Sequence, residues 1–370
     1  MRILFTGGGT GGHVYPIIAI KRTLRKKFGQ EMEFLYIGPN GFAADAFKKE
    51  EIKCKFILAG KLRRYFSLIN FIDLLKIPIG LIQSLWHIFW FMPDIVFSKG
   101  GYGSIPIVLA SWLYQIPIII HESDSVPGLA SKISAYFAKK IIVSFKEAEK
   151  YFPEKKTILL GNPVREELNQ GNKEEGKKIF SLSSEKPVLL VIGGSQGAQK
   201  INEIILNILP RLLEKCEVIH LCGKKNLKEI KINSDKILEK FDSNKKSLYH
   251  LYPFLEEEGL KHAYASANII VSRAGAGNIF EIAAIEKPCI LIPLSTSASD
   301  HQTKNAWALA KIGGAIVLKE KNLTINMLLG AIFGLINDPE KAKKIGEKAK
   351  SFYKPETNQK IAEEIVKLCQ

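Results

Sequence analysis

Two glycine-rich turns are the segments of this sequence best suited to chemistry. The first spans residues 7–13 (GGGTGGH), and the second spans residues 193–198 (GGSQGA). Glycine lets backbone N–H groups approach an anion closely, and the helix start that follows supplies unpaired donors and a favourable dipole. A single turn of this kind is as typical of tight strand-to-helix packing as of binding. Two equivalent turns favour a protein that binds two phosphate-bearing groups.

The first turn also matches the dinucleotide-binding pattern GxGxxG at residues 7–12. That pattern needs a carboxylate at the end of the second strand, where it holds the ribose hydroxyls. Here the apolar run 34–37 ends in Gly38-Pro39-Asn40, so the carboxylate is missing. Neither turn is followed by Gly-Lys-Ser or Gly-Lys-Thr, as a Walker A loop would require. The sequence therefore disfavours a nicotinamide-dependent dehydrogenase and a P-loop NTPase.

Polar side chains accumulate beyond the second turn. Arg273 follows an apolar run, Glu281 lies in the helix predicted next, and Gln302 comes further along the chain. A carboxylate at Glu281 could accept both hydroxyls of a ribose, and Gln302 could donate to sugar hydroxyls or phosphate. Each residue alone is as consistent with a surface or capping role. Together with the second turn, they predict a nucleotide site at the carboxyl ends of parallel strands.

The elements that must position these groups are alternating strands and helices. Short apolar runs predict strands at 3–5, 34–37, 95–97, 118–120, 141–143, 188–192, 218–221, 269–271 and 290–292. Helical spacing places apolar residues on one face after each glycine turn: Ile17, Ile20, Leu24 and Phe28, then Ile201, Ile204, Ile205, Ile208 and Leu212. Strands that alternate with helices form parallel sheets covered on both faces. The sequence therefore predicts an α/β fold with two doubly wound parallel-sheet domains.

Length and composition agree with this interpretation. A chain of 370 residues suits two domains, and the polar stretch at 161–176 marks a boundary with a ligand cleft beside it. The five cysteines lack CxxC spacing, which favours a reducing compartment over a disulfide framework or zinc site. No signal-peptide pattern follows Met1, so we expect no export by that route. Of the formal charge of +16, residues 1–165 carry +11, which favours anionic partners.

Residues 62–92 form an unusual aromatic-rich stretch. Its uncharged part, 77–92, contains Pro78 and Gly80 and is shorter than the roughly 20 residues that span a bilayer. Two interpretations stay open, namely a buried helix and an interfacial patch on an anionic membrane surface. The patch would consist of apolar side chains flanked by arginines: Phe71, Leu75, Trp86, Phe89, Arg63 and Arg64.

The ordered set of motifs resembles the bacterial lipid I N-acetylglucosaminyltransferases, two-domain GT-B glycosyltransferases of peptidoglycan synthesis. The matching segments run nearly end to end: 7–16, 100–103, 121–122, 127–129, 161–165, 193–198, 273–276, Glu281, Gln302 and 305–306. The resemblance implies an N-terminal acceptor-binding, membrane-associating domain at 1–163 and a UDP-sugar-binding domain at 164–350. A C-terminal helix at 351–370 would pack back toward the first domain. The two Rossmann-like domains would face one cleft.

The activity that this resemblance implies is inverting transfer of N-acetylglucosamine from UDP-N-acetylglucosamine to the muramyl 4-hydroxyl of undecaprenyl-linked lipid I, which gives lipid II. The implied donor contacts are Arg165, Ser195, Leu255, Ala276, Glu281 and Gln302. The implied contacts to the acceptor diphosphate are Gly7, Gly8, Gly9, Gly101 and Tyr102. Other implied substrate contacts, near the transferred sugar, are Thr10, Gly11, Gly12 and Asp124.

The resemblance implies no cofactor or metal beyond the donor UDP-N-acetylglucosamine, and the sequence contains no DxD triplet. It implies a peripheral protein at the cytoplasmic face of the plasma membrane, with lipid I, an anionic membrane surface and cell-wall synthesis proteins as partners. Nucleic acid is not among these partners. The basic charge keeps a nucleic-acid-binding protein as an alternative, although interleaved aromatic and basic motifs are missing. A GT-B transferase acting on diacylglycerol or a sterol is a second alternative.

An inverting transfer needs a base near the attacking hydroxyl. His13 is the first candidate, because histidine titrates near neutrality and this one is predicted at the start of a helix. Glu122 and Asp124 are rivals, and His13 could instead cap or orient. Many family members carry His-Glu-Gln-Asn where this chain has HESD at 121–124. A carboxylate at Asp124 loses a hydrogen-bond donor and adds a negative charge, which leaves its role open.

Overall fold

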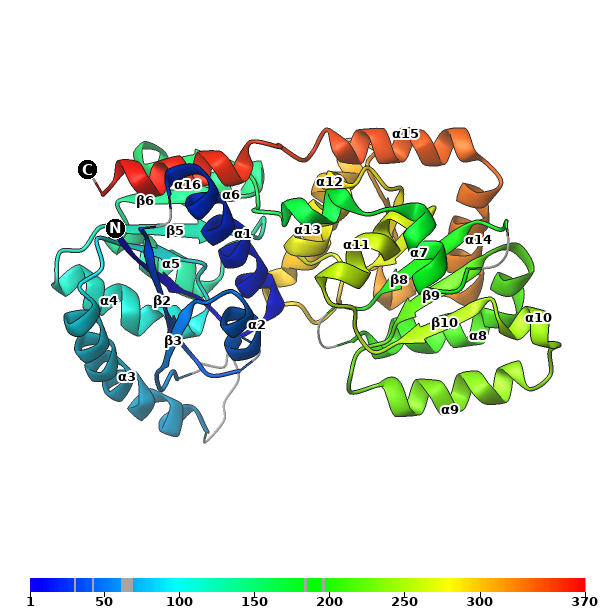
Figure 1. Cartoon of the computed structure of the whole chain (residues 1–370), viewed down its shortest axis with the longest axis horizontal. Coiled ribbons are helices and arrows are strands. Elements are labelled where there is room, and N and C mark those ends of the chain that lie inside the picture. Colours follow the sequence, from blue (N-terminus) through cyan, green and yellow to red (C-terminus); the bar gives the residue numbers. More distant parts are fainter. Residues whose placement is uncertain (30, 42, 61–68, 183–184, 195–196, 370) are drawn as a thin grey trace. The chain divides into compact units, whose positions relative to one another are not determined.

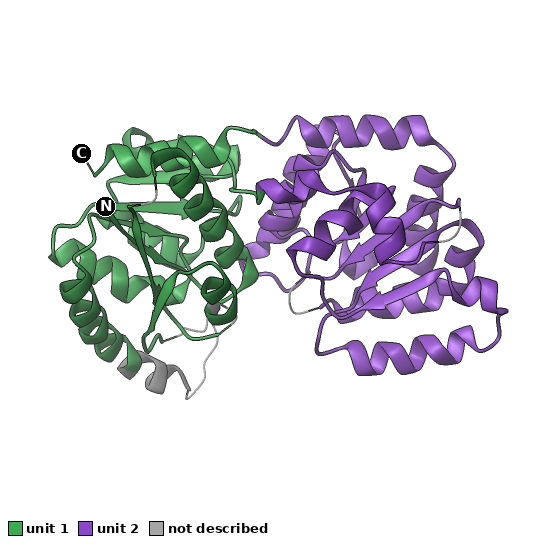
Figure 2. Ribbon diagram, viewed as in Figure 1, with its two compact units in different colours: residues 1–165, 354–370 green, residues 166–353 purple. Residues whose placement is uncertain are grey.

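The computed structural model describes residues 1–29, 31–41, 43–60, 69–182, 185–194 and 197–369, with the backbone alone at 43 and 69–75 (Figure 1). The chain divides into two compact units (Figure 2). Unit 1 contains residues 1–165 and 354–370, and unit 2 contains residues 166–353. Each unit has its own parallel sheet. The predicted α/β class with two doubly wound parallel sheets is confirmed.

Unit 1 is built on a seven-stranded parallel sheet in the order β3-β2-β1-β4-β5-β6-β7. Its strands are β1 (Arg2–Thr6), β2 (Glu33–Gly38), β3 (Lys53–Phe56), β4 (Ile95–Ser98), β5 (Ile118–Glu122), β6 (Lys140–Val143) and β7 (Thr157–Leu159). Its α-helices are α1 (Gly11–Phe28), α2 (Ala43–Lys49), α3 (Ile69–Phe91), α4 (Ile105–Leu113), α5 (Leu129–Phe137), α6 (Lys146–Glu149) and α16 (Thr357–Lys367). The strand order changes direction between β1 and β4, which is the topological switch point.

Successive side chains of β1 pack into two different hydrophobic cores of unit 1, one on each face of the sheet. Ile3 and Phe5 pack with α1 and α16, whereas Leu4 packs on the opposite face with residues of α4 and α5. This alternation follows from the two-residue period of a strand, and it explains why the strands are continuously apolar. On α1, the predicted face is buried at Ile17, Ile20 and Leu24, but Phe28 is exposed at the end of the helix.

Unit 2 is built on a six-stranded parallel sheet in the order β10-β9-β8-β11-β12-β13. Its strands are β8 (Val188–Ile192), β9 (Glu217–Leu221), β10 (Tyr249–Tyr252), β11 (Ile269–Ser272), β12 (Cys289–Leu291) and β13 (Ile316–Val317). Its α-helices are α7 (Lys173–Ile179), α8 (Gln199–Lys215), α9 (Leu227–Leu238), α10 (Ser243–Lys246), α11 (Glu257–Ser266), α12 (Ala276–Ala284), α13 (His301–Lys311), α14 (Ile325–Ile336) and α15 (Pro339–Lys350). The predicted apolar face of α8 is buried along its whole length. Here the switch point lies between β8 and β11.

The C-terminal segment belongs to unit 1. Helix α16 packs against α1, and its Ile361 and Ile365 side chains are buried in the core formed by β1 and β2. Asn358 fixes the start of this helix, because its amide bonds both the backbone N–H and the carbonyl of Val164. Glu166, by contrast, begins unit 2.

Candidate functional site

In unit 1, the predicted acceptor-side residues lie at the carboxyl edge of the sheet, around its switch point. Residues 7–10 follow β1, residues 99–102 follow β4, and residues 123–124 follow β5. These three strands are neighbours in the order β1-β4-β5. The carboxyl ends of adjacent parallel strands lie at one edge of a sheet, and ligands bind there at the switch point. The two glycine segments of unit 1 therefore lie where an anionic ligand would bind.

The glycines of this edge are required by close contacts. A Cβ atom at Gly8 would lie 2.5 Å from the Nδ1 atom of His13, so no side chain fits there. Gly101 has a φ of +85°, and its Cβ atom would lie 3.0 Å from the backbone nitrogen of Gly8. The Tyr36 hydroxyl donates a 3.0 Å hydrogen bond to the carbonyl of Gly7. The glycine segments after β1 and β4, both in unit 1, thus pack directly on each other and on the ring of His13.

His13 lies near the start of α1, as the sequence predicted, and is partly exposed. Its Nδ1 atom lies 3.3 Å from the hydroxyl oxygen of Thr10, in a turn whose Thr10 residue precedes the helix. Burial, reinforced by the positive charge of Lys99, lowers the pKa of His13 to about 4. The imidazole is therefore neutral at pH 7 and able to accept a proton.

Lys99 is a charged residue of this site that sequence reasoning missed. It lies directly before Gly100 and Gly101, and its side chain is buried. Its Nζ atom lies 2.6 Å from His121 Nδ1 and 2.6 Å from Ser123 Oγ. A third contact, of 3.3 Å, joins it to Oδ1 of Asn162, which follows β7. The available signal was a lysine beside a glycine pair at a strand end, but such a lysine is usually solvated.

Glu122 and Asp124 form the acidic part of the same site. The Glu122 side chain is buried, and its Oε1 atom accepts a 2.9 Å hydrogen bond from the backbone N–H of Asp124. Burial and the negative charge of Asp124 raise the pKa of Glu122 to about 7, against the opposing effects of hydrogen bonds from Ser131 and the backbone of Asp124 and of the charge of Lys99. Asp124 is partly exposed, and its charge acts on both His13 and Lys99. The three predicted candidates for the base therefore share one electrostatic environment.

In unit 2, most of the predicted donor-side residues follow β8, β11 and β12, and the other switch point lies between β8 and β11. The turn after β8 has positive φ at Gly194 (+87°) and Gly197 (+77°). A Cβ atom at Gly197 would lie 2.6 Å from the carbonyl oxygen of Cys222, so this position requires glycine. Ser195 lies outside the described residues. Ala276 is the first residue of α12 and is buried.

Glu281 and Gln302 are both held by neighbouring groups of unit 2. The Tyr264 hydroxyl donates a 3.2 Å hydrogen bond to Oε2 of Glu281, on α12. The Oε1 atom of Gln302 accepts a 3.0 Å hydrogen bond from the backbone N–H of Leu294. Because the oxygen of this amide is engaged by the backbone, its NH₂ group is the end that would meet a ligand.

The backbone before Gln302 is strained. Ser299 and Asp300 both have a φ of +54°, a left-handed conformation that costs non-glycine residues energy and is enriched at functional sites. Leu255 is half-buried in the loop between β10 and α11. These positions belong to the same unit as Ala276 and Glu281.

Two arginines of the predicted donor side have other partners. The guanidinium of Arg273 pairs with Glu320 at 2.5 Å, and Glu320 also accepts hydrogen bonds from the backbone N–H and hydroxyl of Ser295. Arg273 therefore ties the end of β11 to the segment after β12. Arg165 belongs to unit 1, where its guanidinium stacks 4.0 Å above the ring of Tyr15.

The aromatic-rich stretch is the helix α3, and two of its predicted patch residues are exposed. The exposed fraction is 62% for Trp86 and 53% for Phe89. The buried-helix interpretation is therefore wrong for these side chains. The side chains of Phe71 and Leu75, and the whole of Arg63 and Arg64, lie outside the described residues. Other large apolar side chains exposed on α3 are Ile79, Ile82 and Trp90.

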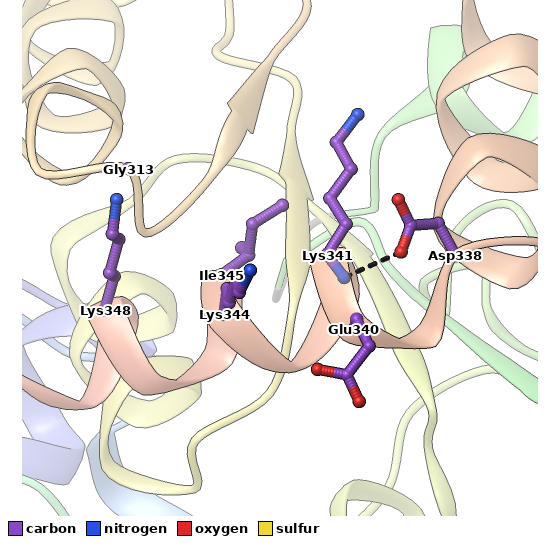
Figure 3. A pocket seen from close by; sticks show the side chains of 7 residues that line it. All are labelled: Gly313, Asp338, Glu340, Lys341, Lys344, Ile345 and Lys348. Atoms are coloured by element: carbon purple, nitrogen blue, oxygen red, sulfur yellow. Dashed lines mark hydrogen bonds between the residues drawn. The ribbon is translucent and has the colours of Figure 1, made fainter.

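Unit 2 also has a surface hollow whose lining residues are distant in sequence from the predicted site residues. Figure 3 shows that it is lined by Gly313 and by residues at 338–348, including three lysines of α15. None of its lining residues is a predicted site residue. Among the residues that the structure describes, no group of three or more His, Cys, Asp or Glu is placed to hold a metal ion. No helix in the described part of the chain is long and apolar enough to cross a membrane.

Comparison with known proteins gives matches over both units. The glycosyltransferase family 28 N-terminal domain matches residues 3–143, and the C-terminal domain of that family matches residues 188–365. A crystal structure of Acinetobacter baumannii MurG superposes with a TM-score of 0.73 at 24% identity, covering 99% of both chains. A UDP-GlcNAc 2-epimerase from Neisseria meningitidis, bound to UDP-GlcNAc, superposes with a TM-score of 0.71 at 15% identity, over 99% and 100% of the chains. These structures support the predicted GT-B fold.

Two relatives are more similar in sequence. The UDP-N-acetylglucosamine–N-acetylmuramyl-(pentapeptide) pyrophosphoryl-undecaprenol N-acetylglucosamine transferase 2 of Bacillus cereus is 42% identical over 89% of each chain. The transferase of the same name from Clostridium tetani is 42% identical over 92% of this chain and 91% of its own. The chain therefore belongs to glycosyltransferase family 28, in the family of UDP-N-acetylglucosamine–N-acetylmuramyl-(pentapeptide) pyrophosphoryl-undecaprenol N-acetylglucosamine transferases.

Proposed function

We propose that this glycosyltransferase transfers N-acetylglucosamine from UDP-N-acetylglucosamine to the muramyl 4-hydroxyl of lipid I and forms lipid II for peptidoglycan synthesis. The observation that carries the proposal is the 42% identity to a transferase named for this reaction, over 89% of each chain. The reaction has two diphosphate-bearing substrates, and the chain has two glycine turns, each at the switch point of its own sheet. Each turn would serve one diphosphate.

The donor would bind to unit 2. Glu281 would accept the ribose hydroxyls, and the NH₂ group of Gln302 would donate to the sugar or the diphosphate. Ser195, Leu255 and Ala276 would complete the contacts, and Arg165 would add a positive charge at the end of unit 1. The start of α12 supplies backbone N–H donors for the charge that develops on the departing diphosphate.

The acceptor would bind to unit 1. Gly7, Gly8, Gly9, Gly101 and Tyr102 would hold its diphosphate, and Thr10, Gly11, Gly12 and Asp124 would contact the transferred sugar. In the reaction, the acceptor 4-hydroxyl oxygen attacks the anomeric carbon of N-acetylglucosamine, and the bond from that carbon to the UDP oxygen breaks. UDP leaves with the electron pair, and the hydroxyl proton passes to a base. His13 would be that base, because its ring is neutral and packs on Gly8 of the first glycine turn.

The lipid-linked acceptor requires access to a membrane surface. Exposed aromatic side chains such as Trp86 and Phe89, beside a basic N-terminal half, suit the interface of an anionic bilayer. We place the protein at the cytoplasmic face of the plasma membrane, held peripherally through α3. The patch would also include Phe71, Leu75, Arg63 and Arg64.

The test of this function is an acceptor comparison with the purified protein. We expect radiolabelled N-acetylglucosamine to pass from its UDP donor to lipid I in vesicles and not to diacylglycerol. Transfer to diacylglycerol alone would identify a different GT-B transferase. Binding of oligonucleotides at physiological salt, without binding of UDP-N-acetylglucosamine, would remove the transferase proposal altogether.

The donor site is tested by Glu281→Gln. This change removes the charged acceptor for the ribose, and a hydrogen bond to a charged group contributes about 1.5–3 kcal/mol. We therefore expect the KM for UDP-N-acetylglucosamine to rise roughly 10- to 150-fold. The matched control is Glu286→Gln, an exposed carboxylate just beyond the same helix, which should leave the donor KM unchanged. Equal effects of the two changes would contradict a ribose contact at Glu281.

A further inference from the structure

The ammonium group of Lys99 is saturated by three protein acceptors. The Nε2 atom of His121 lies 3.0 Å from the carbonyl oxygen of Gly161, and a carbonyl only accepts, so Nε2 carries the hydrogen. The Nδ1 atom of this neutral ring is then an acceptor for Lys99, at 2.6 Å. Ser123 Oγ and Asn162 Oδ1 accept the two remaining hydrogens. Lys99 thus has no hydrogen left for a substrate phosphate.

The charge of Lys99 nevertheless acts on the acceptor side. The groups that interact with it electrostatically are His13 on α1, and His121, Glu122 and Asp124 at the end of β5. Its positive charge lowers the pKa of His13, and it opposes the rise that burial causes in the pKa of Glu122. Burial also lowers the pKa of Lys99 itself, to about 7, while the two carboxylates act in the opposite direction.

Burying a charged lysine costs folding free energy unless the charge is hydrogen-bonded or lies beside an opposite charge. Here two carboxylates lie close together, and a cation beside them relieves their repulsion. The hydrogen bond to Ser123 also fixes the segment that carries Asp124, the partly exposed end of the cluster. Lys99 therefore forms hydrogen bonds to the segment that carries Asp124 and also acts electrostatically on His13, the proposed base.

We propose that Lys99 is a positioning residue of the transfer reaction, which orders the 121–124 segment by hydrogen bonds and places a positive charge that acts on His13 and Glu122. This inference rests on the proposed function. It assigns to a buried lysine the control of protonation on the acceptor side. A purely structural lysine would hold the segment without changing how the site titrates.

The test uses the pH dependence of kcat/KM for lipid I in the full-length enzyme. We expect the ionised form of Glu122 to assist the transfer in which His13 is the proposed base, so the wild-type rate should fall as the pH drops below about 7. Lys99→Met removes the positive charge and makes protonation of Glu122 and His13 easier. We expect the acid limb to move to higher pH, because the charge of Lys99 is one of the interactions that lower the pKa of Glu122.

Two further variants separate charge from contact. In the wild type, loss of the proton from Lys99 above about pH 7 should lower the rate and give a basic limb. Lys99→Arg keeps a charge that does not titrate, so the acid limb should stay and the basic limb should move to higher pH. Ser123→Ala removes one hydrogen bond but no charge, so kcat falls while both limbs stay in place. An acid limb that is unmoved in a folded Lys99→Met enzyme would overturn the proposal. If Lys99→Met does not fold, the deciding variant is Lys99→Arg. A basic limb in Lys99→Arg that is unchanged from the wild type would then overturn the proposal.

A readout that needs no turnover distinguishes this inference from the proposed function. The imidazole resonances of His13 can be followed by NMR during a pH titration, with His13→Gln to assign them. We expect the pKa of His13 to be higher in Lys99→Met than in the wild type, whose value is about 4. An unchanged His13 titration refutes the role of Lys99. A wild-type enzyme that transfers nothing to lipid I refutes the proposed function alone.

Discussion

At the scale of single residues, His13 is the side chain on which the chemistry depends most directly. Its ring is packed on Gly8, is contacted by Thr10, and is neutral above about pH 5 because its pKa is about 4. General bases contribute roughly 10²–10⁴-fold to a rate. We therefore expect His13→Gln to lower kcat by that factor. The shape of the pH profile above pH 5 should not change, since His13 does not titrate there.

The control for this prediction lies on the same turn. Thr10→Val removes the oxygen that contacts the ring but leaves the imidazole, so its effect on kcat should be much smaller. The KM for the donor, which would bind to unit 2, should stay within about twofold in both variants. If His13→Gln lowers kcat less than about tenfold, the base is Glu122 or Asp124.

Many of the candidate site residues could be predicted from sequence, because glycines and residues able to act as a base follow the ends of predicted strands. His13, Glu122 and Asp124 were candidates before any contact was known. Lys99 was not, since its environment is made by His121 on β5 and by Asn162, which follows β7. Long-range pairing of this kind has no local signal. The carboxylate of Asp124 interacts with the charge of this same lysine.

At the scale of elements, the central strands were predictable and the edge strands were not. The four missed strands, β3, β7, β10 and β13, are the outermost strands of the two sheets. Edge strands are only partly covered, so their residues need not form continuous apolar runs. None of the four contains a fully buried residue, in contrast to the wholly buried β4 and β8.

Helix α3 is the element whose exposed aromatic side chains predict contact with a membrane. Trp86 and Trp90 lie edge-to-face at 5.7 Å, and both rings are more than half exposed. Burying such a side chain in an interface contributes about 1.5–3 kcal/mol. We expect the double variant Trp86→Ser/Phe89→Ser to reduce co-sedimentation with anionic liposomes at least roughly tenfold. Neutral liposomes should bind the unchanged protein less well, because the basic charge of the N-terminal half contributes.

A matched control for this surface is available in the other unit. Trp307 on α13 is also exposed, at 43%, but it belongs to unit 2. Trp307→Ser should leave liposome binding as it is. Binding that is indifferent to lipid charge and to the α3 substitutions would remove the membrane role of this helix.

At the scale of the whole molecule, unit 1 is assembled from two distant parts of the chain. The resemblance placed a terminal helix at 351–370, and the structure has α16 at 357–367. Its contacts include the buried amide of Asn358 on Val164 and an ion pair between Lys27 and Glu363. The chain leaves unit 1 after Arg165 and returns at Lys354. The stability of unit 1 therefore depends on residues that follow the whole of unit 2.

This arrangement predicts a stability change confined to one unit. Ile365 is fully buried in the unit 1 core, so Ile365→Ala should destabilise unit 1 by about 2–5 kcal/mol. In calorimetry, UDP-N-acetylglucosamine should raise the midpoint of the unit 2 transition, which identifies it. Ile365→Ala should lower the other midpoint and leave the ligand-sensitive one in place.

Lys360→Ala, on the exposed side of α16, removes only an i,i+4 pair and should cost less than about 0.5 kcal/mol. A shift of the ligand-sensitive transition by Ile365→Ala would mean that the two units unfold together and that α16 supports both.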